Sequence, residues 1–325
     1  MRKILSLGLV ICLVLCFSAG LAEGRIAEPT VEKAVTAGPQ PENYILDESK
    51  TYAVGYKDPT LEITITDGRY LDTTWTAARI KIAYPAQLRT AMYRDRYGSG
   101  SGNGEYVSAY AERKNAVFAI NDDWFMSQYR QNVGCVIRQG NLYRLRCDES
   151  KNRYDILAID DQGDFHALQH ATNDDITNFP GRIVNAFVFG PAVVVDYQAQ
   201  PVPEDNNMGA FHKAQRMGIG QIGPLEYICL CCEGPEDPGS TGLTVEEFGQ
   251  LAASFGDVRI FYNLDGGSSA TMVFKGVTRY GKETLWAKIN APMNNKVRPT
   301  GGAIYFISAW LPEGQEGITI EEAKP

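Results

Sequence analysis

The sequence predicts an α+β fold, a single domain with a mixed, strand-rich sheet core and few helices. Short runs of β-branched and aromatic residues recur along most of the chain, separated by turns that contain Gly, Asn or Asp. A single segment combines a complete helix cap with a long apolar stripe at helical spacing. No internal repeat appears, and 325 residues are enough for one large core.

Residues 1–22 are predicted to be a secretory signal peptide. Two basic residues precede the apolar run 4–17, and Gly20-Leu21-Ala22 supplies a small-x-small cleavage site. The alternative is an uncleaved membrane anchor, which the short length of the apolar run disfavours. We therefore expect a secreted or extracytoplasmic protein with no stable membrane span after cleavage.

Three further regions are predicted after the signal peptide. Residues 23–43 are rich in Pro, Glu, Ala and Thr and are expected to form a flexible tether, residues 44–312 the domain, and residues 313–325 a polar tail. Residues 1–22 contain two positive charges and no negative charge, so the remaining chain has a net charge of −10. An acidic exported chain without a Lys/Arg cluster is not expected to bind nucleic acid.

The first half of the domain is predicted to be mostly strands. Residues 61–66 alternate with period two before an Asp67-Gly68 turn. The next predicted elements are a strand over 75–84, a short helix over 87–94, a flexible loop over 98–104, a helix over 108–114 and a buried strand over 116–120.

The second half continues with short strands and one well-defined helix. Thr244 and Glu247 form a capping box, and an apolar stripe follows until Phe255-Gly256 ends the helix. The predicted strands are 135–138, 142–145, 155–159, 165–168, 187–195 (interrupted at Gly190-Pro191), 217–221, 225–232 and 303–309, with a loop and a helical turn over 169–182.

The most informative motif follows an apolar strand that ends at Asp265. After this carboxylate come two glycines and two serines, Gly266, Gly267, Ser268 and Ser269. Glycine lets a ligand approach the main chain, and the serine hydroxyls can donate or accept hydrogen bonds. The alternative interpretation is a hairpin turn, because Asp-Gly-Gly is strong turn chemistry. Asn263, two residues earlier, can orient the carboxylate.

A second motif, Asn121-Asp122-Asp123, ends the buried strand over 116–120. Sites are often carried by the loops that follow such strands. Asn121 and Asp123 are interpreted as functional, whereas Asp122 is interpreted as the cap of a helical turn over 124–125.

Two arginines and one glutamate complete the candidate set. Arg216 has glycine neighbours, and a planar guanidinium in that setting suits an anion such as phosphate. A surface salt bridge is the alternative role for Arg216. Arg298 has a similar setting before the last strand, and Glu233 ends the strand that contains three cysteines.

The cysteines and histidines predict no metal centre. Cys135 and Cys147 flank a hairpin and can pair, but buried apolar thiols are the favoured interpretation for all five cysteines after residue 22. The Cys229-x-Cys231-Cys232 spacing does not fit the usual zinc pattern. The three histidines form no triad, and neither a Gly-x-Ser-x-Gly elbow nor a nucleotide-binding glycine motif is present.

Taken in order, these motifs resemble the phosphodiester glycosidase family from about residue 50 to about residue 310. The matching blocks are 119–125, 189–194, 216–220, 242–248, 263–269 and 298–299. Three positions depart from the family pattern: Asp122 and Ser268 each replace a glycine, and Met217-Gly218 replaces Thr-Ala.

The resemblance implies a hydrolase that cuts the glycosyl–phosphate bond of sugar-1-phosphodiesters, such as those of N-acetylglucosamine, without a cofactor. Asp265 would be the first catalytic carboxylate, and Asp123 or Glu233 the second. The expected sugar- and phosphate-binding set is Asn121, Arg216, Asn263, Gly266, Gly267, Ser268, Ser269 and Arg298.

Two other functions stay open at this point. The chain could be a non-catalytic exported protein that binds carbohydrate, exopolysaccharide or envelope material on the same fold. It could also be a metal-assisted phosphodiesterase, in which Asp122, Asp123 and Asp265 bind a divalent cation.

Overall fold

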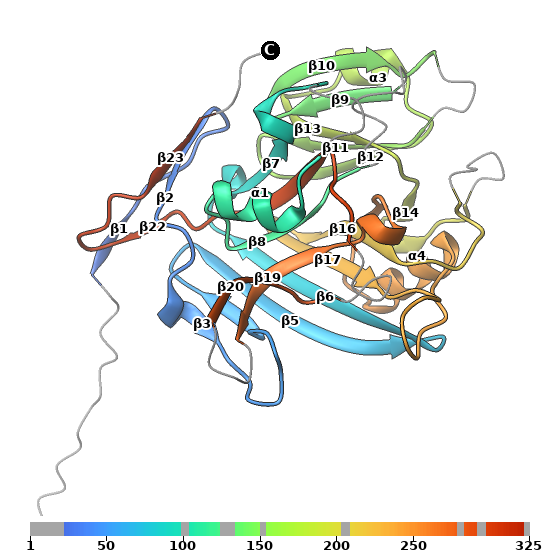
Figure 1. The fold of residues 1–325 in the computed structure, drawn as a ribbon. Helices are drawn as coiled ribbons and strands as arrows, with labels where there is room; N and C mark the ends of the chain where they lie inside the picture. The colour runs from blue at the N-terminus through green and yellow to red at the C-terminus, as the bar shows by residue number, and fades with distance from the viewer. Residues whose placement is uncertain are drawn as a thin grey trace, which may run out of the picture.

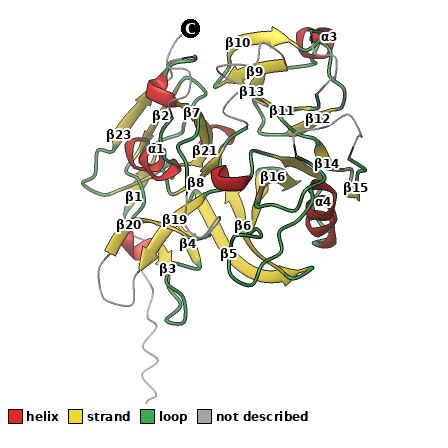
Figure 2. Ribbon diagram, turned by 45° about the vertical axis from the view of Figure 1, so that its right-hand side comes forward, coloured by secondary structure: helices red, strands yellow, loops and turns green. Residues whose placement is uncertain are grey.

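The computed structural model describes residues 23–98, 104–123, 134–149, 154–202, 209–277, 283–290 and 297–321. Within them the chain forms several packed sheets with few helices, which confirms the predicted α+β class (Figures 1 and 2). The predicted signal peptide and most of the predicted loop over 98–104 lie outside the described residues. No helix in the described ranges is long and apolar enough to cross a bilayer.

The largest layer is a nine-stranded sheet. Its longest pair is antiparallel and runs from Leu61↔Ile82 to Tyr70↔Thr73, so the turn lies at Leu71-Asp72 and not at the predicted Asp67-Gly68. In spatial order its strands are β15 (Gln198–Ala199), β14 (Ala192–Val195), β18 (Ile260–Asn263), β16 (Arg216–Gly223), β17 (Glu226–Cys232), β6 (Thr73–Ile82), β5 (Leu61–Tyr70), β4 (Gly55–Lys57) and β3 (Tyr44–Ile45).

Two five-stranded sheets pack near this layer. One has the order β20 (Glu283–Lys288), β19 (Met272–Val277), β8 (Phe118–Asn121), β21 (Gly302–Phe306) and β7 (Leu88–Met92). The other has the order β10 (Asn141–Arg146), β9 (Gly134–Arg138), β13 (Ile183–Val188), β11 (Ile156–Asp160) and β12 (Phe165–Leu168). The prediction of a helix over 87–94 was wrong, because strand β7 lies there. Its five residues are all buried, as in a strand covered on both faces, and it pairs with β21.

Two of the helices pack against sheets, one on the nine-stranded sheet and one on the sheet that contains β8. Helix α4 (Val245–Ser254) begins at the predicted capping box, where the Glu247 amide donates to Thr244 Oγ1 at 3.1 Å and the Thr244 amide donates to Glu247 Oε2 at 2.8 Å. Helix α1 (Val107–Arg113) confirms the helix predicted over 108–114, and α3 (Asn173–Thr177) is the predicted helical turn. The 3₁₀ turns are η1 (Pro41–Asn43), η2 (Pro85–Gln87), η3 (Tyr93–Asp95) and η4 (Gly267–Ser269).

The main core lies between the sheets. It joins Ile63 and Ile80 of the large sheet to Phe118 and Phe306 of the β8–β21 pair and to Phe187 of β13. A second cluster lies under α4, and a third lies under α1. All five cysteines in the described ranges are buried, as the favoured interpretation expected, and none is paired.

The two ends of the described chain form strands together, so the predicted tether and polar tail need correction. Strand β1 (Gly24–Ile26) pairs with β22 (Trp310–Pro312), and β2 (Lys33–Thr36) pairs with β23 (Ile318–Glu321). Figure 1 shows these blue and red segments side by side. The sequence does not reveal this pairing because each strand is short and polar, and its hydrogen-bond partner is distant in sequence. Ala34 and Ile320 become buried only when β2 and β23 pair.

Candidate functional site

Two strands that are distant in sequence end at one place, and Asn121 joins their loops. Asn121 ends β8, and its Nδ2 donates to the main-chain oxygen of Asp265 at 2.9 Å and to that of Asp122 at 3.1 Å. The Thr271 amide donates to Asn121 Oδ1 at 3.0 Å. Asn121 is completely buried, so its role in this structure is to hold the Asp265 loop on β8.

The loop after β18 presents Asp265 together with an arginine. Arg298 Nη2 donates to Asp265 Oδ2 at 2.9 Å, and Arg298 Nε donates to Ser269 Oγ at 2.6 Å. The Asp265 side chain is 8% exposed and that of Arg298 is 41% exposed. Burial raises the pKa of Asp265 above its ordinary value, while Arg298 and the Ser269 hydroxyl limit the rise. The site therefore offers a sheltered carboxylate beside an accessible cation.

The two glycines let this loop lie against the neighbouring chain. A Cβ atom at Gly266 would lie 2.6 Å from the main-chain oxygen of Gln215, a separation that only glycine avoids. Gly267 has φ +57° and donates its amide to that same oxygen at 2.9 Å. The Gly267 amide therefore already has a partner within the protein, whereas the sequence prediction had it binding a phosphate oxygen. Gly266, Gly267 and Ser268 form the partly exposed edge of the loop.

A buried ionic layer lies beneath Asp265. The Asp265 amide contacts the main-chain oxygen of Asp122 at 3.4 Å. Arg138, at the end of β9, donates from Nη2 to Asp123 Oδ1 at 2.8 Å and reaches Asp122 Oδ2 at 3.5 Å. Asp123 Oδ2 accepts the Val188 amide at 2.9 Å. The guanidinium of Arg138 also lies over the ring of Phe187, 4.3 Å from its centroid.

The charges of this layer favour a protonated Asp122. Among the described residues, the carboxyl groups of Asp122, Asp123 and Asp265 lie beside the guanidiniums of Arg138 and Arg298, and the charge of Arg144 also acts on Asp123. Burial, followed by the charge of Asp123, raises the pKa of Asp122 well above its ordinary value. A proton on Asp122 removes one negative charge from this buried group, which lowers the cost of burying it.

Three predicted site residues have their side chains occupied elsewhere. Arg216 donates to the main-chain oxygens of Leu243 and Gly209, each at 2.9 Å, and to that of His212, so it holds the loop before α4 instead of facing the solvent as a phosphate ligand. Burial lowers the pKa of Arg216. Asn263 Nδ2 donates to Gly190 at 2.8 Å. Glu233 accepts a hydrogen bond from Ser240 at 3.2 Å, in the loop after β17.

The carboxylates of the site already face cations supplied by the protein. Asp122 and Asp123 contact Arg138, and Asp265 contacts Arg298. Within the described ranges, no three His, Cys, Asp or Glu side chains gather as a metal site. The donor set is therefore a poor fit for the divalent cation that the three aspartates suggested.

The sequence interpretation missed Arg138 and Gly302. A charged residue at the end of the apolar run 135–137 was the available signal for Arg138, which is 2% exposed. Gly302 begins β21, where a Cβ atom would lie 2.3 Å from Asp122 Oδ2 and 2.5 Å from the main-chain oxygen of Ala91. Its small size lets the Asp122 carboxyl fit beside β21.

Comparison with known proteins points to one family. A family model described as phosphodiester glycosidase matches residues 114–307, a span that contains the whole cluster around Asp265. The catalytic domain of the zebrafish N-acetylglucosamine-1-phosphodiester alpha-N-acetylglucosaminidase, auto-inhibited by its pro-peptide, is similar with a TM-score of 0.56 and 16% identity, over 85% of this chain and 88% of that chain.

A hypothetical protein from Synechocystis has a TM-score of 0.55 and 13% identity, over 77% of this chain and 62% of that chain. At these identities the structural likeness shows a shared fold. No curated protein matches the sequence significantly.

Proposed function

Since this chain belongs to the phosphodiester glycosidase family, we propose that it hydrolyses the bond between the anomeric carbon of a sugar and the phosphate oxygen of a sugar-1-phosphodiester. The family supports glycosidase chemistry, and the substrate class is our proposal. The zebrafish protein is named for an N-acetylglucosamine-1-phosphodiester, which makes that sugar the first substrate to test. We place the activity outside the cytoplasm because residues 1–22 have the pattern of a signal peptide.

The observation that carries the proposal is the Asp265–Arg298 pair. A sugar-1-phosphodiester has an electron-poor anomeric carbon one bond away from an anionic phosphate. The Asp265 carboxylate is 8% exposed, the Arg298 guanidinium is 41% exposed, and the two are 2.9 Å apart. The carboxylate can therefore face the anomeric carbon while the guanidinium faces the adjoining phosphate. The guanidinium can bind phosphate oxygens through its fixed planar donors while the carboxylate faces the sugar.

The proposed reaction breaks the bond from the anomeric carbon to the phosphate oxygen, and the electron pair stays on phosphate. The carboxylate of Asp265 stabilises the positive charge that develops on the sugar. Arg298 stabilises the leaving phosphate, which is a good leaving group and needs little proton donation. The oxygen of a water molecule then bonds to the anomeric carbon, and one proton of that water is released. The products are a free sugar and a phosphate monoester.

In this proposal the buried ionic layer holds the Asp265 carboxylate in position. Asp122, Asp123 and Arg138 are each 2% exposed or less, so they support the Asp265 loop from below. Asn121 fixes the main chain of the same loop. A carboxylate held in this way loses little free energy to reorganisation during the reaction.

The test is release of sugar and phosphate monoester from methyl N-acetylglucosamine-α-1-phosphate by purified residues 23–325. We expect turnover that Asp265→Asn lowers about a hundredfold or more. The matched control is Asp257→Asn, because Asp257 also pairs with an arginine, Arg79, but at an exposed position. Activity in Asp265→Asn equal to that of the control would contradict the assignment of Asp265.

Repeating the assay with a chelator distinguishes the proposed reaction from the metal-assisted alternative. We expect the same rate with and without EDTA, because arginines already neutralise the carboxylates. Loss of activity with EDTA, restored by a divalent cation, would favour the metal-assisted reaction. Folded protein that binds sugar phosphates without turnover would favour the non-catalytic carbohydrate-binding alternative.

A further inference from the structure

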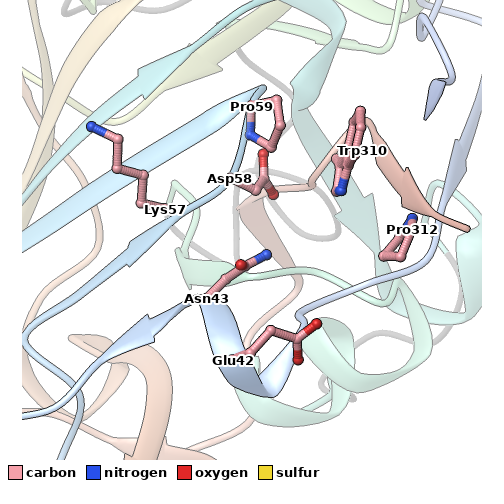
Figure 3. Close-up of a pocket in the computed structure, with 7 residues that line it drawn as sticks. All are labelled: Glu42, Asn43, Lys57, Asp58, Pro59, Trp310 and Pro312. Carbon is pink, nitrogen blue, oxygen red and sulfur yellow. The ribbon is translucent and has the colours of Figure 1, made fainter. Parts of the chain in front are cut away.

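A second pocket lies where the start of the described chain meets its end. It is a cavity of about 500 Å³, within the range of ordinary ligand pockets. Figure 3 shows Trp310 and Pro312 on one side, with Asp58 and Asn43 facing them and Glu42 at the lower edge. These residues come from η1, the turn between β4 and β5, and strand β22.

This pocket is separate from the Asp265 site. Strand β21 starts at Gly302, beside the carboxyl of Asp122, and runs to Phe306. Trp310 follows four residues after the far end of that strand. The two sites therefore lie beyond opposite ends of β21, and a ligand in one would not touch the residues of the other.

We propose that this pocket binds a neutral sugar residue of a glycan, with Trp310 as its stacking surface. The Trp310 ring is held in place because it lies directly against Gly24, where a Cβ atom would come within 2.4 Å of the ring. The side chain remains partly exposed, and its indole nitrogen makes no hydrogen bond within the described residues. An aromatic ring with an available polar tip suits a ligand that is apolar on one face and carries hydroxyls at its edge.

Glu42 and Asn43 supply the polar groups that can bind those hydroxyls. Asp58 Oδ1 accepts from the Thr60 amide at 2.7 Å, the Thr60 hydroxyl at 2.9 Å and the Leu61 amide at 2.9 Å, and its Oδ2 is buried, so Asp58 contributes negative charge to the pocket wall and no direct contact with the ligand. Glu42 is exposed at the edge, and Asn43 adds an amide. Hydroxyl-to-carboxylate hydrogen bonds are strong, so a few such groups can orient a sugar.

The charge of the pocket excludes anionic ligands. Among the described residues that line the pocket, Lys57 is the one cation, and its Nζ is paired with Glu62 Oε2 at 2.9 Å. The carboxylates of Glu42 and Asp58 remain, so a phosphate or a uronic acid would be repelled. A proline-rich peptide is also uncharged, but the grooves that bind such peptides present several aromatic side chains, whereas Trp310 is the single aromatic residue among the described residues that line this pocket.

To test this proposal, chitotriose, cellotriose and maltotriose are titrated separately into isotope-labelled residues 23–325, and binding is followed by NMR chemical shifts. The protein carries Asp265→Asn to prevent turnover. The affinity per atom of small ligands implies a dissociation constant of about 1 mM for one sugar residue. We expect at least one trisaccharide to bind, Trp310→Ala to weaken it about tenfold or more, and Trp310→Phe to retain part of the affinity. Glu42→Ala, at an exposed position, should weaken binding without affecting folding.

Three results would overturn the proposal. One is no binding of any of the three sugars at about ten times the expected dissociation constant. Another is sugar binding that Trp310→Ala and Glu42→Ala both leave unchanged in folded protein. The third is binding of a proline decapeptide, dependent on Trp310, when no sugar binds. In the otherwise wild-type chain, Trp310→Ala should leave hydrolysis of the small phosphodiester unchanged, so failure of the pocket and failure of the proposed reaction are distinguishable.

Discussion

Arg138 is the cation of the buried layer, and Arg138→Met tests whether this layer holds the site together. The substitution keeps much of the apolar stem but removes the donor that contacts Asp123 at 2.8 Å and Asp122 at 3.5 Å. The packing of the stem over Phe187 would be largely retained. The change therefore removes mainly the charge and its hydrogen bonds.

The expected loss of unfolding free energy is about 3–5 kcal/mol, the usual cost of removing one partner of a buried ion pair. Arg138 is 2% exposed and the side chains of Asp122 and Asp123 are fully buried, so water cannot replace the missing cation. The lower end of the range is favoured near neutral pH, because proton uptake by the aspartates can neutralise part of the remaining charge.

Urea denaturation followed by circular dichroism measures this loss. With a denaturant slope of about 3 kcal/mol per molar, the midpoint should fall by about 1 M or more. The matched control is Arg79→Met, which breaks the exposed Arg79–Asp257 pair and should cost about 1 kcal/mol or less. Adding Asp123→Asn to Arg138→Met should recover part of the stability. Equal small losses in Arg138→Met and Arg79→Met would refute the reasoning.

Three further predictions follow from the same geometry. Gly302→Ala should cost about 1–3 kcal/mol of unfolding free energy and reduce hydrolysis, because its Cβ would lie 2.3 Å from Asp122 Oδ2; wild-type stability and rate in this variant would contradict the packing described. Burial and the charge of Asp123 raise the pKa of Asp122 above 3.8, so the folded protein holds a proton that the unfolded chain releases. Stability should therefore fall as pH rises from about 4 toward the raised value, and Asp122→Asn should remove that part of the fall in urea denaturation measured at several pH values. An unchanged pH dependence would argue against a protonated Asp122. Burial raises the pKa of Cys135 to about 12 and of Cys147 to about 11, so a thiol reagent should label none of the five cysteines before unfolding and all five after it; two missing thiols after unfolding would indicate a Cys135–Cys147 disulfide.

The sequence predicted the parts of the site that depend on the order of strands and loops. Asn121 ends β8 and Asp265 lies two residues after β18, so each was recognisable as a polar residue that follows an apolar run, and the family resemblance placed both in one site. Arg298 was recognisable by its place before the last strand. The α4 boundary was predictable because the capping box is local, with both of its hydrogen bonds made within four residues.

The sequence could not show how side chains are oriented or which distant segments pair. Arg216 has the glycine neighbours of an anion site, but its guanidinium donates to three main-chain oxygens before α4. Strand β7 is short and apolar, and burial by the surrounding sheets decides its conformation against helical propensity. The importance of Arg138 depends on two aspartates that precede it by 15 and 16 residues, a relation that only the fold creates.

The most direct test of the central claim is the position of bond cleavage. The wild-type chain hydrolyses methyl N-acetylglucosamine-α-1-phosphate in water enriched in oxygen-18, and mass spectrometry locates the label. A glycosidase that breaks the bond to the anomeric carbon places the label in the free sugar and none in methyl phosphate. Label found in a phosphate product would mean that the phosphorus–oxygen bond breaks, and would contradict the assignment of this site as a phosphodiester glycosidase.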